Sequence, residues 1–236
     1  MEITIRKKHR KLNHYKTRGC PLCRSINTKF FYKGKKRDNY RSYFCCNNCD
    51  LVFVDKWQQL NKFDELSRYK EHNNDPNDKG YRKFLSRLIK ELIPYLNEGM
   101  LGLDYGCGPV PALSMIMRNK RYNMKIYDPY FYRRKRVLNE RFDFITSSEV
   151  IEHFNNPYGE FIRLNKLLKK NGYLAIMTNL LNDKENFKNW HYKNDLTHIS
   201  FYSKETMRWI ANKFNYKVFF PNRNVIIFKK IRGGQL

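Results

Sequence analysis

The sequence has no long apolar segment and few acidic residues, and both shortages limit what the protein can be. No window approaches the roughly 20 consecutive apolar residues that a membrane-spanning helix needs. The first eight residues, Met1 to Lys8, also lack the apolar run of a secretory signal. We therefore expect a protein without a membrane span that stays in the cytoplasm.

The shortage of acids gives the chain a strong positive charge. Lys and Arg together number 47 against 22 Asp and Glu, so the formal net charge is +25 over 236 residues. Such a surface attracts polyanions and releases their counterions, which makes RNA the expected partner. An A/T-rich coding sequence would also raise the Lys and Asn content without any selection for binding, and the sequence alone leaves that alternative open.

Only six cysteines are present, and their spacing favours a metal site over disulfides in a cytoplasmic protein. Cys20 with Cys23, and Cys46 with Cys49, form two C-x2-C pairs that are 22 residues apart. Two such knuckles can supply the four thiolates of a tetrahedral Zn²⁺ ion. The alternative is four unligated thiols in a small fold. We predict a zinc ribbon with Cys45 as a spare thiol; whether the ribbon binds substrate or only caps the fold stays open.

Composition and periodicity divide the chain into four segments. They are a basic arm (1–17), the zinc ribbon (18–55), a helical linker (56–98) and an α/β domain (99–236). In the linker, apolar residues from Arg82 to Leu96 recur with the period of an amphipathic helix that ends near Pro94.

The last segment alternates short apolar strands with helices. Met100–Tyr105 and Gly172–Thr178 are typical of buried strands, and Tyr158–Leu168 is typical of a helix. This alternation predicts an α/β fold with a mostly parallel sheet that is covered on both faces. About three residues join the last two strands, Tyr216–Phe220 and Asn224–Lys229, which is too short a link for parallel pairing. The C-terminal pair must therefore be antiparallel.

A glycine turn follows the first of these strands. Asp104 ends the strand, and Gly106 and Gly108 form a Gly-x-Gly bend that leads into a helix. Asp128 ends the next strand, where a carboxylate can accept hydrogen bonds from ribose hydroxyls. The turn alone is a weak signal, because many nucleotide-binding folds share it. A dinucleotide site would want a third glycine, and Ala112 or Leu113 stands in that place.

With Glu149-Val150-Ile151-Glu152-His153 downstream, these motifs make residues 18–230 resemble the class I S-adenosylmethionine (SAM)-dependent methyltransferases. The resemblance is strongest to a subgroup with a zinc-binding N-terminus and an EVIEH segment, and it implies a Rossmann-like sheet. It places the amino-acid part of SAM at Asp104, Gly106 and Gly108, and its ribose at Asp128. It also implies that Glu149 faces the cofactor, and that a lid over the cofactor includes Tyr69, His72 and Tyr81.

The sequence departs from the family pattern in two places. Val110 replaces the usual third glycine of the turn, and only 13 residues separate Asp128 from Phe142. That interval is too short for the usual third helix and strand, so the adenine pocket is expected to be shortened. Tyr130 and Phe131 are the candidates for its lining.

The loop from Trp190 to Tyr202 is polar and aromatic, and it follows a predicted strand of the parallel sheet. Loops at the carboxyl ends of such strands form the binding crevice. Its His191, Asp195 and His198, together with His153, are therefore candidates to orient or deprotonate a methyl acceptor. A purely structural role in fixing the loop remains open for each of them.

These observations together predict a SAM-dependent methyltransferase that acts on RNA or an RNA-associated substrate. Two alternatives remain. One is a methyltransferase for a small molecule or for a glycan or envelope precursor, with the ribbon as a structural cap. The other is a non-catalytic zinc-ribbon protein, which the complete set of Asp104, Gly106, Gly108 and Asp128 argues against. The acceptor atom and the oligomeric state stay open.

Overall fold

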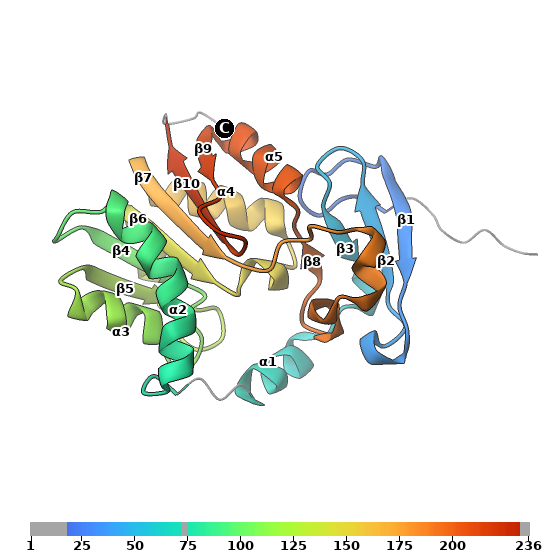
Figure 1. The fold of residues 1–236 in the computed structure, drawn as a ribbon, viewed down its shortest axis with the longest axis horizontal. Helices are drawn as coiled ribbons and strands as arrows, with labels where there is room; N and C mark the ends of the chain where they lie inside the picture. Colours follow the sequence, from blue (N-terminus) through green and yellow to red (C-terminus); the bar gives the residue numbers. More distant parts are fainter. Residues whose placement is uncertain (1–17, 72–74, 232–236) are drawn as a thin grey trace, which may run out of the picture.

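A computed structural model describes residues 18–71 and 75–231, which form a large and a small β-sheet (Figure 1). The predicted basic arm and His72 lie outside the described residues. The large sheet has six strands in the order β5-β4-β6-β7-β10-β9. Their bounds are β4 Leu101–Tyr105, β5 Asn123–Tyr127, β6 Phe142–Ser148, β7 Leu168–Met177, β9 Tyr216–Phe219 and β10 Val225–Lys230.

Four strands of this sheet are parallel, and the C-terminal pair is not. β5, β4, β6 and β7 run in one direction, while β10 pairs antiparallel with both β7 and β9. The predicted α/β class, with its mostly parallel sheet and antiparallel end, is therefore confirmed. Between Asp128 and Phe142 the chain forms only a short 3-10 turn, Lys135–Asn139, which agrees with the missing helix and strand.

Helices cover both faces of the sheet. α2 (Lys79–Leu92) and α3 (Ala112–Asn119) pack on one face, where Phe144 and Ile227 belong to the same apolar cluster. α4 (Pro157–Leu167) and α5 (Lys204–Phe214) pack on the other face. The two clusters take alternate residues of the buried strands, as a sheet covered on both sides requires.

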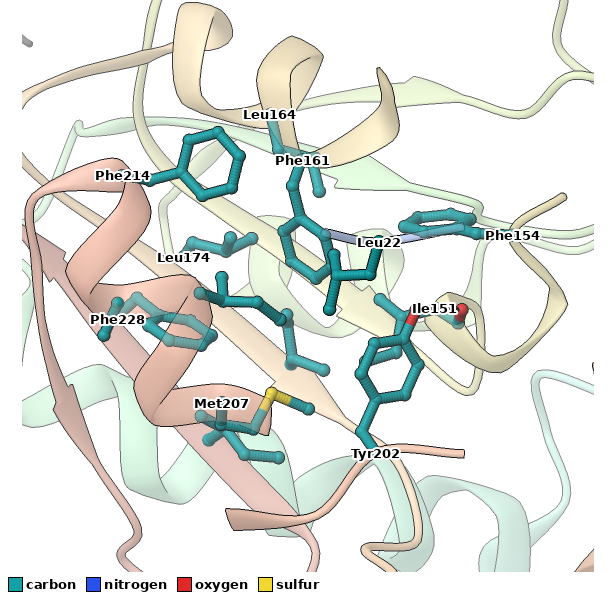
Figure 2. Close-up of a cluster of buried hydrophobic side chains, with 14 of the residues drawn as sticks. Leu22, Ile151, Phe154, Phe161, Leu164, Leu174, Tyr202, Met207, Phe214 and Phe228 are labelled. Atoms are coloured by element: carbon teal, nitrogen blue, oxygen red, sulfur yellow. Dashed lines mark hydrogen bonds between the residues drawn. The ribbon is translucent and has the colours of Figure 1, made fainter. Parts of the chain in front are cut away.

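The small sheet belongs to the cysteine-rich segment but is completed from elsewhere in the chain. β1 (Thr28–Lys33), β2 (Ser42–Cys46) and β3 (Val52–Val54) form an antiparallel meander. The fourth strand, β8 (Ser200–Phe201), comes from the polar loop of the α/β domain and pairs with β3. Figure 2 shows Leu22 of the ribbon among Phe154, Phe161 and other side chains of the α/β core. The ribbon is thus built into the core of the α/β domain.

The remaining elements are a linker helix and short turns. α1 (Lys62–Glu71) lies between the ribbon and α2 in the chain. The other 3-10 turns are Lys36–Asp38, Lys56–Gln58, Ile93–Tyr95, Ile151–His153, Glu185–Asn189 and His191–Asn194. Predicted boundaries differ from these elements by a few residues: α2 begins at Lys79 because Asp78 caps it, and β7 begins four residues before Gly172. Among residues 18–71 and 75–231, no helix is long and apolar enough to cross a membrane.

Candidate active site and metal-binding ribbon

The glycine turn after β4 has the backbone conformation that its glycines predict. Gly106 and Gly108 have φ values of +80° and +65°, in the left-handed region that side chains rarely adopt. A Cβ at Gly106 would lie 2.5 Å from a methyl carbon of Val150, whereas one at Gly108 would meet nothing within 4 Å. Gly106 therefore lets the turn pack against the segment after β6, and Gly108 leaves open space above the turn.

The carboxylates that end β4 and β5 are both buried. Asp104 accepts hydrogen bonds from Thr146 Oγ1 at 3.0 Å and from Ser114 Oγ at 3.3 Å, and its burial raises the pKa of the carboxyl to about 6. Asp128 accepts the backbone N–H groups of Gly108, Tyr130 and Phe131 at 2.8–3.0 Å. A carboxylate has about four lone-pair sites, so Asp128 holds the turn and the next loop together and still has an acceptor site left.

A cavity of about 650 Å³ lies above these carboxylates, in the size range of ligand pockets. It gathers most of the residues that the sequence singled out. Among its lining residues are Tyr69, Tyr81, Asp104, Gly106, Gly108, Asp128, Tyr130, Phe131, Glu149, His153, Asp195 and His198. His191 is exposed and is not among the lining residues, so the structure does not bring it to this cavity.

The cavity is acidic although the protein is basic. Its lining includes six carboxylates but only two Lys and Arg residues, Lys62 and Arg163. In the whole chain, by contrast, Lys and Arg outnumber the acids by 47 to 22. A cationic ligand is therefore favoured at this place in the molecule.

One wall of the cavity is held by a glutamate that the sequence did not reveal. Glu65 of α1 accepts the hydroxyls of Tyr69 and Tyr130, each at 2.6 Å, and its side chain is buried. The Tyr69 ring packs against His153 with centroids 5.4 Å apart. Glu65 therefore fastens the linker helix over the cavity. Because α1 mixes its polar and apolar residues, no clear periodicity marked this contact.

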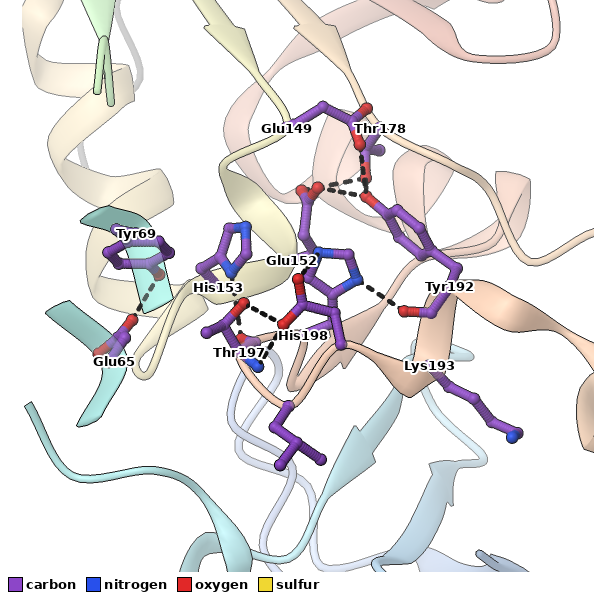
Figure 3. A network of polar contacts seen from close by, with 12 residues as sticks. Glu65, Tyr69, Glu149, Glu152, His153, Thr178, Tyr192, Lys193, Thr197 and His198 are labelled. Carbon is purple, nitrogen blue, oxygen red and sulfur yellow. Dashed lines mark hydrogen bonds and ion pairs between the residues drawn. The ribbon is translucent and has the colours of Figure 1, made fainter. Parts of the chain in front are cut away.

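At the wall of the cavity, two glutamates, Glu149 and Glu152, share one tyrosine hydroxyl (Figure 3). Tyr192 Oη contacts Glu149 Oε2 at 3.1 Å and also Glu152 Oε1, and Thr178 Oγ1 donates to Glu152 Oε2 at 3.1 Å. A single hydroxyl hydrogen cannot be donated to both carboxylates at once. Burial raises the pKa of Glu149 and of Glu152 to about 7 each. Glu152 and Tyr192 were not predicted as site residues, although both stand inside motifs that the sequence singled out.

The two histidines of the cavity are neighbours. The rings of His153 and His198 have centroids 4.8 Å apart. His198 Nε2 lies 3.8 Å from Asp195 Oδ2, while Asp195 Oδ1 accepts the backbone N–H of Thr197 at 2.8 Å and its hydroxyl at 2.7 Å. Burial alone would raise the pKa of Asp195, but His198 and these hydrogen bonds outweigh burial and lower it. Three of the four predicted catalytic residues thus lie together.

The four predicted metal ligands also come together. The sulfurs of Cys20, Cys23, Cys46 and Cys49 lie within 4.8 Å of one another, with closest pairs at 3.4 and 3.5 Å. Zinc–thiolate bonds of about 2.3 Å in a tetrahedron put sulfurs about 3.8 Å apart, so this spacing fits one Zn²⁺ ion. Cys45 lies outside the group.

The two knuckles have the same backbone geometry. The carbonyl of Cys20 accepts the N–H of Arg24, and that of Cys46 accepts the N–H of Asp50, both at 2.9 Å. Arg24 and Asp50 have φ values of +62° and +63°. Burial raises the pKa of the Cys46 thiol to about 12. A cation is therefore needed to keep this buried thiol ionised.

One fully buried arginine of the ribbon, Arg41, binds the loop from Trp190 to Tyr202. This loop carries His191 and His198 and is the histidine loop of the following paragraphs. Arg41 Nη1 donates to the carbonyls of Leu196 and His198 at 3.0 Å, and Nη2 donates to those of Asp195, at 3.0 Å, and Lys193. Its exposed fraction is 1%. Four backbone carbonyls of the loop are thus bound by one side chain of the ribbon.

A buried ion pair reinforces this contact. Lys193 Nζ lies 3.2 Å from Asp38 Oδ2, and Tyr43 donates to the same oxygen at 3.1 Å. The backbone N–H of Val54 also donates to the carbonyl of Ile199 at 2.9 Å. The position of Asp195 and His198 therefore depends on the ribbon as well as on the α/β domain.

Comparison with known proteins gives the family. Residues 78–219 match the family model described as a methyltransferase domain. No curated protein matches the sequence.

The chain is also similar to solved structures. The 1,6-didemethyltoxoflavin-N1-methyltransferase of Burkholderia thailandensis, solved with bound 1,6-didemethyltoxoflavin and S-adenosylhomocysteine, is 12% identical to this chain. Its TM-score is 0.51 over 82% of this chain and 97% of its own. A SAM-dependent methyltransferase from Thermotoga maritima is 16% identical, with a TM-score of 0.41 over 62% and 89% of the two chains. Magnesium protoporphyrin IX methyltransferase from Synechocystis is 13% identical, with a TM-score of 0.45 over 72% and 94%. At these identities the likeness concerns the fold alone.

Arg41→Met is expected to release the histidine loop. Removing the guanidinium leaves four buried carbonyls with fewer donors, and hydrogen bonds from a charged group contribute about 1.5–3 kcal/mol each. We expect the free energy of unfolding to fall by at least about 3 kcal/mol, with faster amide exchange over residues 193–198. Urea unfolding and hydrogen exchange measure the two effects. Arg37→Met, which changes an exposed arginine in the turn Lys36–Asp38, is the control; equal behaviour of both variants would contradict the prediction.

Cys46→Ser is expected to abolish zinc binding by the ribbon. The purified wild-type chain should carry about one zinc per molecule, measured by elemental mass spectrometry, because four thiolates complete the site. The variant should lose the metal and unfold at lower temperature, since metal binding stabilises the folded ribbon. Cys45→Ser removes an adjacent buried thiol and should keep the zinc. Full zinc content in the Cys46 variant would rule out this ligand set.

Proposed function

Since this chain belongs to the SAM-dependent methyltransferases, we propose that its methyl acceptor is RNA or an RNA-associated molecule. The supporting observation is a run of exposed basic residues, Arg133 to Arg136, that begins two residues after Phe131 at the cofactor cavity. Phosphates bound by this run would lie beside the place where the methyl group is held.

A second cavity extends this basic surface. It has a volume of about 700 Å³ and is lined in part by Arg118, Lys125, Arg134, Lys135 and Arg136. Among the described lining residues, Glu140 is the one acid, and it forms an ion pair with Lys125. A row of cations with so few acids is suited to a polyanionic backbone.

The acidic cavity is suited to the cofactor. SAM carries a sulfonium and an ammonium group, and we assign its amino-acid part to Asp104 with Gly106 and Gly108. The open space above Gly108 lets the ligand approach the backbone closely. We assign the ribose to the remaining acceptor site of Asp128, and the adenine to Tyr130 and Phe131. Tyr69 and Tyr81 line the same cavity from the linker and would cover the cofactor.

When bound, SAM supplies a methyl group on a positively charged sulfur, which a nucleophile can displace in line. The residues of the chain then position the acceptor and exclude water. His153, Asp195 and His198 are our candidates to orient the acceptor or to take its proton, because they line the cavity within reach of one another. His191 has no part in this proposal. Glu149 faces the same space.

The ribbon has a positioning role in this proposal. Its contacts through Arg41 and Asp38 are made with the loop that carries Asp195 and His198. We therefore infer that the zinc ribbon, proposed to hold one Zn²⁺ ion, acts first as a structural cap that fixes this loop.

Asp104→Asn and Asp128→Asn are expected to weaken SAM binding by about 10–150-fold each. Each replacement keeps the size of the side chain but removes a charge-assisted hydrogen bond of about 1.5–3 kcal/mol. Isothermal titration calorimetry with SAM measures the change. Asp183→Asn alters an exposed carboxylate outside the cavity and should leave the affinity unchanged. Unchanged affinity in both cavity variants would overturn the placement of the cofactor.

Arg134→Gln/Arg136→Gln is expected to weaken RNA binding in a salt-dependent way. Loss of two phosphate contacts should reduce the slope of log K against log salt by about 1.4 for single-stranded RNA. Fluorescence anisotropy with an RNA oligonucleotide at several salt concentrations measures this slope. The control Lys213→Gln/Lys217→Gln removes two exposed charges from α5 and β9, far along the chain from the basic run.

The acceptor itself is identified by deleting the gene and comparing the mass profiles of digested RNA and of small metabolites. The proposal expects a methylated nucleotide, or a methylated RNA-bound component, to disappear. Two results together would instead assign a small-molecule acceptor. The first is loss of a methylated small metabolite, and the second is an equal reduction of RNA binding by the arginine variant and by its lysine control.

A further inference from the structure

Glu152, His153 and His198 bring three ligand atoms within 4.8 Å of one another at the wall of the cofactor cavity (Figure 3). Glu152 and His153 come from the turn after β6, and His198 comes from the loop before β8. This group is separate from the four cysteines of the ribbon. The methyl-transfer proposal assigns no role to Glu152.

Both imidazoles are oriented by backbone carbonyls. His198 Nδ1 lies 2.7 Å from the carbonyl oxygen of Tyr192, and His153 Nδ1 lies 3.1 Å from that of Thr197. A carbonyl oxygen can only accept, so each Nδ1 carries a hydrogen, and in the neutral form of each ring Nε2 is the atom that can bind a metal. Histidines that bind metals are commonly held in this tautomer by the same kind of contact.

The carboxylate is oriented as well. Glu152 has an exposed fraction of 0%, and its two oxygens accept hydrogen bonds from Tyr192 and Thr178. A buried carboxylate is stabilised by a cation or stays protonated. Next to it, Glu149 Oε1 is buried and has no hydrogen-bond partner within the described part of the chain. Glu152 therefore lies close to both histidines, and Glu149 is joined to it through the hydroxyl of Tyr192.

We propose that Glu152, His153 and His198 bind a divalent transition-metal ion such as Mn²⁺, Fe²⁺, Co²⁺ or Zn²⁺. Two imidazoles and a carboxylate favour these ions over Mg²⁺ and Ca²⁺, which prefer oxygen ligands only. Metal–ligand bonds of about 2.0–2.2 Å separate opposite ligands by at most about 4.4 Å, so a small inward movement of the side chains completes the site.

The ion would have coordination positions open to the cavity, because His153 and His198 line it. A role for the ion in methyl transfer rests on the proposed methyltransferase function. An oxygen of the acceptor, such as a hydroxyl, would occupy an open position on the ion. A bound cation lowers the pKa of such a hydroxyl. As the acceptor oxygen forms a bond to the methyl carbon, the carbon–sulfur bond breaks, its electron pair stays on sulfur, and the hydroxyl proton passes to Asp195 or to water.

The test measures metal binding to the full chain with zinc already in the ribbon. Co²⁺ is titrated without SAM and followed by absorption spectroscopy and calorimetry. The proposal expects about one additional equivalent with the weak visible bands of nitrogen and oxygen ligands, and without the intense charge-transfer band that thiolates produce. His153→Ala and His198→Ala should each weaken this binding at least about tenfold, since even the loss of a supporting contact costs this much.

His191→Ala is the matched control, because it removes an exposed histidine from the same loop and should leave the binding of Co²⁺ unchanged. Tyr192→Phe, which removes only the hydroxyl that contacts Glu152, serves as a second variant should His198→Ala fail to fold. Absence of a second equivalent in the wild-type chain, or equal binding by all variants, overturns the proposal. SAM binding is measured separately on the same samples, so loss of the metal site and loss of the methyltransferase function give different results.

Discussion

The contact on which the candidate active site depends most is the one between Arg41 and the histidine loop. This loop is irregular, and a buried irregular segment must find partners for its carbonyl groups. Arg41 binds four of them with its two terminal nitrogens. A lysine in its place would offer a point charge without the planar fork that reaches several acceptors. His198 therefore owes its position at the cavity to a residue more than 150 positions earlier in the chain.

The second constraint is electrostatic. A chain with a net charge of +25 repels a cationic cofactor unless its charges are arranged locally. The structure places six carboxylates around one cavity and a run of exposed cations, from Arg133 to Arg136, beside it. This separation of charge is consistent with a cationic methyl donor in the cavity and an anionic acceptor outside it. Burial has a cost, because it raises the pKa of Asp104 to about 6 and those of Glu149 and Glu152 to about 7.

Local patterns predicted the fold and the glycine turn at the cavity. Strand periodicity, the Gly106–Gly108 bend and the short interval after Asp128 each describe consecutive residues, and the structure has the corresponding elements. The two C-x2-C pairs likewise lie together. By contrast, β8 completes the ribbon with only two residues, Ser200 and Phe201, too few for any periodicity to show. Arg41 and Glu65 look like ordinary charged residues until their distant partners are known.

The histidine loop illustrates why residue type alone was insufficient. His191 and His198 stand in the same motif, and nothing local distinguishes them. The structure does so through hydrogen bonds: His198 binds the carbonyl of Tyr192 and contributes its own carbonyl to Arg41, while His191 is exposed. Because the ribbon supplies Arg41, and the ribbon is expected to need its metal to fold, a zinc ion outside the cavity would govern the arrangement of ligands within it. Such coupling is structural, and it does not require the zinc ion to touch either substrate.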